Sequence, residues 1–433
     1  MGATLAKTVG HFFPQLRSWL TDLTETRFEP LIVYHRRFMV WVGLAVFLLK
    51  LGARRKIGFE LASPMSLANL NHLSGCRQQS IPHPDTLDHF VGHAILGEVA
   101  AIRRKMIHRL IRMKALDDAR LRGHLIVVLD GTGQLVYHER HCEHCLEQTV
   151  HGKTIYSHPV LEAKLVTPSG LAISVGTEFI ENVNPKASKQ DCELAAFGRL
   201  ARRLKKDFPQ LQLCLCLDAL YACGQVLEVC RENHWKYFIV FKEGSLPAVW
   251  QEFQMLLKLC PHNRKVHRPA RGCRQTFAWA EDLQYVDDRG RPQQFNAFQC
   301  HEVRPGKKQF FAWMTNFRLG AENVIASANR GARCRWKIEN QGFNIQKNGG
   351  FNLEHAYSNT IEKAKVYYLL MQIAHLMLQL IEKGSLLPED CITLFGGLGT
   401  MARRLSESLR HYLIDPQTLA ATAAGIRIRL DTS

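Results

Sequence analysis

The sequence lacks the features of a secreted or membrane-embedded protein. Its 13 cysteines among 433 residues are too dilute for a disulfide scaffold. The first residues do not have the charged and then apolar pattern of a secretory leader. The longest apolar run, residues 38–49, has 12 residues, whereas a membrane span needs about 20. We therefore expect a cytoplasmic chain with no membrane partner, in which this run is a buried helix.

Acidic residues are scarce beside basic ones. The chain has 39 Asp and Glu but 56 Lys and Arg, which gives a formal charge of +17. A polyanionic partner such as nucleic acid explains this excess, and the alternative is a merely soluble basic surface. Residues 1–122 hold 18 of the basic and 9 of the acidic residues. In this region Arg103, Arg104 and Lys105 could follow a DNA backbone, or they could lie on a solvated helix face.

Internal repeats and low-complexity tracts are absent as well, so only local patterns divide the chain. We expect five segments, which are a basic helical N-terminal domain (1–120), the first part of an α/β core (121–243), a β-rich insertion (244–320), the second part of the core (321–384) and a C-terminal tail (385–433).

The first part of the core has signals in the order strand, strand, strand, helix, strand, helix, strand. Apolar runs predict buried strands, and the turn residues of 167–170 predict a hairpin between the second and the third. The five predicted strands are 124–129, 160–166, 171–179, 211–217 and 237–241. This order indicates an α/β protein with a mixed sheet flanked by helices.

Two acidic residues, Asp130 and Asp218, directly follow predicted buried strands. Parallel neighbouring strands would bring both carboxylates to one sheet edge, where α/β sheets place their ligands. Either residue could instead be a helix cap. A third carboxylate is needed to hold two divalent metal ions, and Glu339 is the candidate. It lies one helical turn after Arg335, so the alternative for this pair is an ordinary surface ion pair.

Together these features resemble the DDE insertion-sequence transposases of the cut-and-paste type, over about residues 120–383. The resemblance rests on the strand order, on LDGTG around Asp130, on LDALYA around Asp218 and on RWKIE ending at Glu339. It implies a ribonuclease H-like core that is interrupted by a β-rich insertion between the second Asp and the Glu.

The resemblance also implies an activity. Asp130, Asp218 and Glu339 would hold two Mg²⁺ or Mn²⁺ ions for hydrolysis of a phosphodiester, and the freed 3′-hydroxyl would attack another. The implied partners are double-stranded DNA, with terminal inverted repeats and a target site, and a second copy of the chain that makes a synaptic homodimer. The basic N-terminal domain would bind the DNA ends.

The third motif departs from the family pattern. In that family an Arg and a Lys near the Glu hold DNA phosphates, which implies this role for Arg335 and Lys347. The position of the family's Tyr is Ala332, however, and Gln346 stands at the Lys position, one residue before Lys347. Two other hypotheses therefore stay open: a transposase-derived DNA-binding protein with a decayed site, and a nuclease that cuts without joining.

A cluster of cysteines and histidines lies after the first predicted strand. Cys142 and Cys145 have the spacing of zinc ligands, and nearby imidazoles could complete a tetrahedral structural Zn²⁺ site. The alternative is a loop with free thiols and merely polar histidines. The candidate imidazoles are those of His138, His141, His144, His151 and His158.

Overall fold

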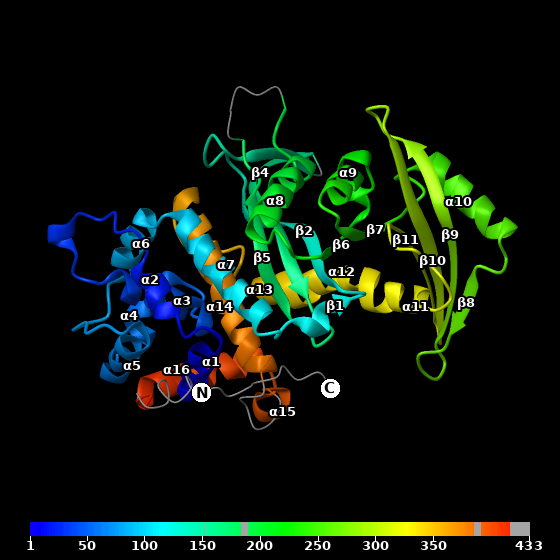
Figure 1. Cartoon of the computed structure of the whole chain (residues 1–433). Coiled ribbons are helices and arrows are strands. Elements are labelled where there is room, and N and C mark those ends of the chain that lie inside the picture. Colours follow the sequence, from blue (N-terminus) through cyan, green and yellow to red (C-terminus); the bar gives the residue numbers. More distant parts are fainter. Residues whose placement is uncertain (151, 183–188, 385–390, 416–433) are drawn as a thin grey trace.

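The computed structural model describes residues 1–150, 152–182, 189–384 and 391–415. Its N-terminal quarter is helical (Figure 1). The expected buried helix at 38–49 is confirmed, because Phe38 to Leu48 of α3 are buried. The helices are α1 (Gly2–Phe12), α2 (Leu16–Thr21), α3 (Arg36–Leu48), α4 (Ile57–Glu60), α5 (Pro64–Ser74), α6 (Pro84–His93) and α7 (Leu96–Arg112).

A mixed sheet follows the helices. Its central strands run in the order β5-β4-β2-β6-β7, in which β2 is parallel to β6 and β6 to β7, whereas β4 is antiparallel to β2 and β5. This is a ribonuclease H-like arrangement of three antiparallel strands and two parallel ones, as expected. The strands are β1 (Arg120–Leu121), β2 (His124–Tyr137), β3 (Leu146–Val150), β4 (Lys153–Val166), β5 (Ala172–Phe179), β6 (Leu213–Leu217) and β7 (Lys236–Val240).

Helices cover both faces of this sheet (Figure 1). α8 (Glu193–Asp207) packs on β4 and β5, where Leu200 and Leu204 touch Gly176. The opposite face of β4 carries Lys164, which touches Gly342 of a later helix. Successive side chains of a strand point to opposite faces, so the two coverings lie on different sides. α9 (Gly224–Glu232) connects β6 to β7.

The insertion between β7 and the last part of the core differs in one element from the expected β-rich segment. It begins with the helix α10 (Pro247–Leu259), whose buried side chains Val249, Phe253 and Leu257 are four residues apart and form one helical stripe against β9. The sheet that follows contains β8 (Arg264–His267), β9 (Arg274–Val286), β10 (Pro292–Arg304) and β11 (Lys307–Thr315). Because β11 pairs with β7, core and insertion share one sheet, which has 11 strands within the described residues.

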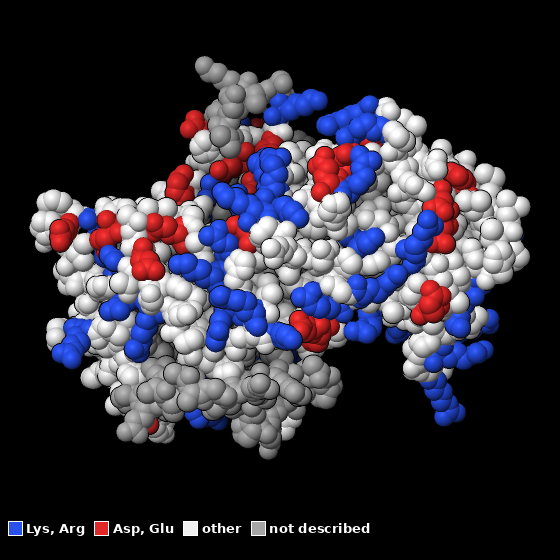
Figure 2. Space-filling model, in the orientation of Figure 1, with Lys and Arg blue, Asp and Glu red and all other residues white. Residues whose placement is uncertain are grey.

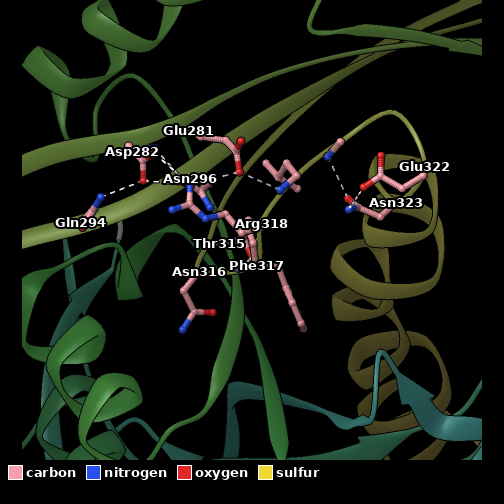
Figure 3. A network of polar contacts seen from close by, with 12 residues as sticks. Glu281, Asp282, Gln294, Asn296, Thr315, Asn316, Phe317, Arg318, Glu322 and Asn323 are labelled. Atoms are coloured by element: carbon pink, nitrogen blue, oxygen red, sulfur yellow. Dashed lines mark hydrogen bonds and ion pairs between the residues drawn. The ribbon is translucent and has the colours of Figure 1, made fainter.

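Polar contacts fix the point where the chain leaves the insertion (Figure 3). Asn296 of β10 donates to the Phe317 carbonyl at 2.7 Å, and Arg318 pairs with Asp282 of β9 at 3.0 Å. The backbone N–H of Leu319 donates to the Glu281 carboxylate at 3.0 Å. These bonds hold the turn from which the next helical run starts.

This helical run extends from 324 to 348 and changes its winding several times. Two of its turns are π-helical, a form that is rare and frequent at functional sites. Gly331 lets the run pass close to the sheet, since an added Cβ would lie 2.5 Å from a ring carbon of Phe238. The segments are α11 (Val324–Ala326), η5 (Ser327–Gly331), η6 (Ala332–Cys334), α12 (Arg335–Lys337), η7 (Ile338–Phe343) and α13 (Asn344–Asn348).

The helix α14 (Ile361–Lys383) lies between the N-terminal helices and the sheet (Figure 1). It packs against α3, α7 and β5, so one hydrophobic core runs through both parts of the molecule. By length and composition α14 could cross a membrane, but its most apolar window is 94% buried inside the fold. It is therefore a core helix.

Part of the expected C-terminal tail is helical. α15 (Cys391–Phe395) and α16 (Leu398–His411) are described, and α16 packs on α5, where Asn69 donates to the carbonyls of Leu409 and Tyr412 at 2.9 and 2.8 Å. The expected tail also includes 385–390 and 416–433, which lie outside the described residues.

Candidate catalytic site

Asp130 and Asp218 hold equivalent positions on neighbouring parallel strands. The last paired residues of β2 and β6 are Val128 and Cys216, and each aspartate comes two residues later. A spacing of two keeps a side chain on the same face of the sheet. The register therefore places both carboxylates opposite each other, just beyond the end of the parallel ladder.

The expectation that the strand stops at Asp130 is wrong. β2 continues to Tyr137, and Asp130 is paired with Glu162 of β4. The strand continues because the antiparallel partner β4 goes on supplying hydrogen bonds after β6 has ended. Asp218 does end its strand, and its Oδ1 accepts a hydrogen bond from the Leu220 N–H at 2.9 Å, as a helix cap would.

Asp130 lies among other acidic groups. Burial raises the pKa of its carboxyl from the usual 3.8 to about 6, although the Arg335 guanidinium opposes the shift. The negative charges of Glu193, Asp218 and Glu339 raise this pKa further. A divalent cation would relieve this repulsion, and carboxylate oxygens are the ligands that Mg²⁺ prefers.

Glu339 is exposed and lies in the π-helical turn η7. Arg335, one turn before it, does not form the surface ion pair considered above among the described residues. Its Nη1 instead lies 3.4 Å from Oδ2 of Asp130, and its guanidinium covers the Trp336 ring at 4.5 Å. Arg335 thus links the helical run to the strand that carries Asp130.

A fourth carboxylate, Glu193, belongs to this acidic cluster and was not predicted. It is the first residue of α8, and its Oε1 accepts a 2.6 Å hydrogen bond from the Tyr221 hydroxyl. Its other oxygen lies so close to Gly131 that an added Cβ would be 2.5 Å away. Burial and the charge of Asp218 raise the pKa of Glu193. No local pattern marks this residue, because it comes from a helix start 63 residues after Asp130.

The acidic cluster is open in its present arrangement. Among the residues that the structure describes, the carboxylate oxygens of Asp130, Asp218 and Glu339 do not all lie within 4.8 Å of one another. The residues present fit a site for hard divalent cations by their chemistry.

One of the residues expected to contact DNA is buried. The Arg103 guanidinium donates to the hydroxyls of Ser174 and Thr177 at 2.6 and 2.5 Å, and it lies 3.8 Å from the Glu162 carboxylate. Its side chain is 6% exposed, so the expectation that Arg103 follows a DNA backbone is wrong. Arg103 lies on the side of α7 that faces the sheet, and its polar partners belong to β4 and β5.

The other expected DNA-binding residues are partly exposed and have partners within the chain. Arg104 pairs with Asp207 at 2.7 Å, and the Lys105 ammonium lies 6.0 Å from the Trp19 ring centre. Lys347 pairs with Glu354 at 3.0 Å. Figure 2 shows further Lys and Arg side chains over α7 and α8 on one face of the molecule.

The Gln346 side chain, at the position of the family's Lys, is buried. Its amide donates to Gln372 of α14 at 2.8 Å and contacts Nδ1 of His375 at 2.9 Å. Gln346 therefore takes part in buried polar contacts with α14.

Within the described residues, the cysteine and histidine cluster brings together Cys142, Cys145 and His158. Sγ of Cys142 lies 3.6 Å from Sγ of Cys145, and both sulfur atoms contact Nε2 of His158, at 3.3 and 3.2 Å. Burial lowers the pKa of His158 to about 4, so the imidazole is neutral. His141 and His144 instead contact the backbone carbonyls of Asn359 and Asn182, and His151 lies outside the described residues.

No family model and no curated protein matches this sequence. Among solved structures, the chain is similar to a piggyBac transposase in its synaptic complex with hairpin DNA. The sequences are 10% identical and the TM-score is 0.45, and the match covers 98% of this chain and 82% of that chain. A likeness of this size does not decide an activity.

Proposed function

We propose that this protein is a DNA transposase of the DDE type. The observation that carries the proposal is the equivalent register of Asp130 and Asp218 at the end of the β2–β6 ladder, with Glu339 and Arg335 on the helical run beside it. In open α/β sheets, ligands usually bind beyond the carboxyl ends of parallel strands, at the point where the strand order reverses.

In this proposal Asp130, Asp218 and Glu339 hold two Mg²⁺ or Mn²⁺ ions. Such ions, when bound, activate water and stabilise the leaving oxygen during phosphodiester cleavage. Glu193 adds negative charge that strengthens cation binding. Arg335, which pairs with Asp130, is placed to neutralise a phosphate, and the exposed Trp336 beside it offers a face for a nucleobase.

The DNA substrate follows from the charge and from the resemblance. The excess of basic residues suits double-stranded DNA, whose phosphates release counterions when they are neutralised. We propose that the chain binds terminal inverted repeats of a mobile element, cleaves there and transfers the 3′-hydroxyl ends to a target. Two copies would hold the two ends together. The helical region before residue 121 is the part proposed to bind the DNA ends. Arg103 is not among the proposed contacts, because its side chain is buried.

The direct test uses the full chain, a labelled duplex made from the DNA that flanks its coding region, a target plasmid and Mg²⁺ or Mn²⁺. A transposase gives labelled DNA joined to the plasmid. Cleaved duplex without joined product means a nuclease, and a shifted band without cleavage means a DNA-binding protein with a decayed site. Either of the last two results rejects the proposal.

Asp130→Asn and Glu339→Gln are the matched variants, because each keeps the shape of the side chain and removes a negative charge. Both should stop cleavage and leave DNA binding in place. Full activity in either variant would show that the triad is wrongly assigned.

A further inference from the structure

Three potential metal ligands outside the acidic cluster come together from two parts of the chain. Cys142 and Cys145 belong to the connection between β2 and β3, and His158 belongs to β4. Their ligand atoms all lie within 4.8 Å of one another. We infer that Cys142, Cys145 and His158 bind one structural Zn²⁺ ion.

The distances fit a tetrahedral zinc ion. Zinc bonds of about 2.3 Å to sulfur and about 2.0–2.1 Å to nitrogen put neighbouring ligand atoms about 3.6–3.8 Å apart. The three observed separations are 3.6, 3.3 and 3.2 Å, slightly short of this, and a bound ion would open the triangle a little. A disulfide is not formed, because its sulfur atoms would be about 2.05 Å apart.

The surroundings suit a structural ion. Cys145 and His158 are buried, and Cys142 is half-buried. The loop is held on its outer side by Asn182, which donates to the Cys145 carbonyl at 3.0 Å and accepts from Nδ1 of His144 at 2.8 Å. The ligand set is therefore already in place without large movement of the backbone.

The ligand types separate this ion from the one proposed for the acidic cluster. Thiolate and imidazole select Zn²⁺, whereas carboxylates suit Mg²⁺ and Mn²⁺. The two sites lie on neighbouring strands, since His158 of β4 is paired with Leu135 of β2, five residues after Asp130. A register shift between Gly133 and Leu135 interrupts the β2–β4 ladder at this point.

The zinc ion would strengthen this weak point of the sheet. It would tie the loop after β2 to β4 and so fix the loop beside the start of α14, where His141 contacts the Asn359 carbonyl at 3.1 Å and stacks on Tyr137 at 4.4 Å. Its role is to hold the loop in place, and it takes no part in phosphodiester chemistry.

The test measures zinc in the full chain, purified without chelator and then exchanged into zinc-free buffer. About one equivalent of zinc per chain is expected, as for other structural sites. Cys142→Ala and His158→Ala should each lose nearly all of it. Cys260→Ser, which changes a free cysteine after α10 in the insertion, is the control and should keep it.

Two further measurements cover the case in which these variants fold poorly. Cys142→His supplies another zinc ligand and should restore binding. Replacement of Zn²⁺ by Co²⁺ in the wild-type chain should give the thiolate charge-transfer absorption of a tetrahedral cysteine site. Wild-type protein that holds far less than one equivalent after zinc loading, equal zinc in the Ala variants, or a Cys142–Cys145 disulfide by mass would each overturn the inference.

Discussion

Asp130 and Glu162 lie directly opposite each other on neighbouring strands, and their surroundings are opposite in kind. The Glu162 carboxylate is fully buried and accepts hydrogen bonds from the hydroxyls of Ser174, Thr177 and Tyr368, with Arg103 close by. Asp130 lies 3.4 Å from the Arg335 guanidinium, and the carboxylates of Glu193, Asp218 and Glu339 raise its pKa.

The difference separates a structural carboxylate, Glu162, from a carboxylate that is proposed to bind a metal ion, Asp130. A buried charge with several donors is stabilised inside the chain and needs nothing from outside. A partly buried charge among like charges is costly unless a ligand completes its surroundings. Removal of the charge should therefore affect different properties at the two residues. At Asp130 it should lower activity, and at Glu162 it should lower stability.

The largest expected effect is loss of activity in Asp130→Asn. Removal of a metal ligand should slow Mg²⁺-dependent cleavage by at least about ten thousandfold, or roughly 5.4 kcal/mol. The rate is measured on the labelled duplex under single-turnover conditions. Glu162→Gln, assayed at a temperature where it is folded, is the control and should cleave at a rate within about tenfold of the wild type. An equal loss of cleavage rate in both variants would contradict the proposed difference between Asp130 and Glu162.

The next effect is loss of stability at Glu162. Glu162→Ala leaves the Arg103 charge buried without a counter-charge, which should lower the free energy of unfolding by about 3–5 kcal/mol. Urea denaturation of the full chain gives this quantity. Asp130→Ala is the matched change on the opposite strand and should not lower stability in the presence of chelator. A Glu162→Ala chain as stable as the wild type would contradict the structural role.

A smaller effect concerns pH. Because the pKa of Asp130 is raised to about 6 in the folded chain, this state holds a proton that the unfolded chain releases near pH 4. The stabilising contribution is complete below about pH 4 and is lost as the pH rises through about 6. Without metal, the wild type should lose up to about 3 kcal/mol of unfolding free energy relative to Asp130→Asn between these limits.

Denaturation of both chains at a series of pH values in chelator measures this difference. Other titrating groups affect both chains and largely cancel. A difference that stays constant with pH, or that grows as the pH falls, would show that Asp130 is ionised like an ordinary aspartate.

The smallest expected effect is at Glu193, which lies beside the triad and is held by Tyr221. Glu193→Gln should slow cleavage by about 10–100-fold, as is common for groups that support metal ligands. Raised Mg²⁺ concentration should recover part of the rate, because the lost charge mainly weakens cation binding. A loss as large as that of Asp130→Asn would make Glu193 a direct ligand and enlarge the proposed triad.

Much of the core could be predicted from the sequence because its signals are local. Apolar runs that end in acids identified β2 and β6 and the positions of Asp130 and Asp218. The prediction of a β-rich segment over 244–320 does not include the helix α10, although Val249, Phe253 and Leu257 have helical spacing. The proposed role of Glu339 stays a prediction that the mutations above address.

The sequence by itself determined which segments form buried strands and where acidic residues follow them, since strand and helix periodicity depends on near neighbours. Only the tertiary structure decided that Arg103 is buried while Arg104 is partly exposed, and that His158 completes the cysteine pair. It also decided that the carboxylates of Asp130 and Glu162, which lie opposite each other, have different surroundings. Hydroxyls of β5 and α14 surround Glu162, whereas Glu193 of α8 adds a like charge near Asp130. These partners are distant in the sequence, and packing alone brings them together.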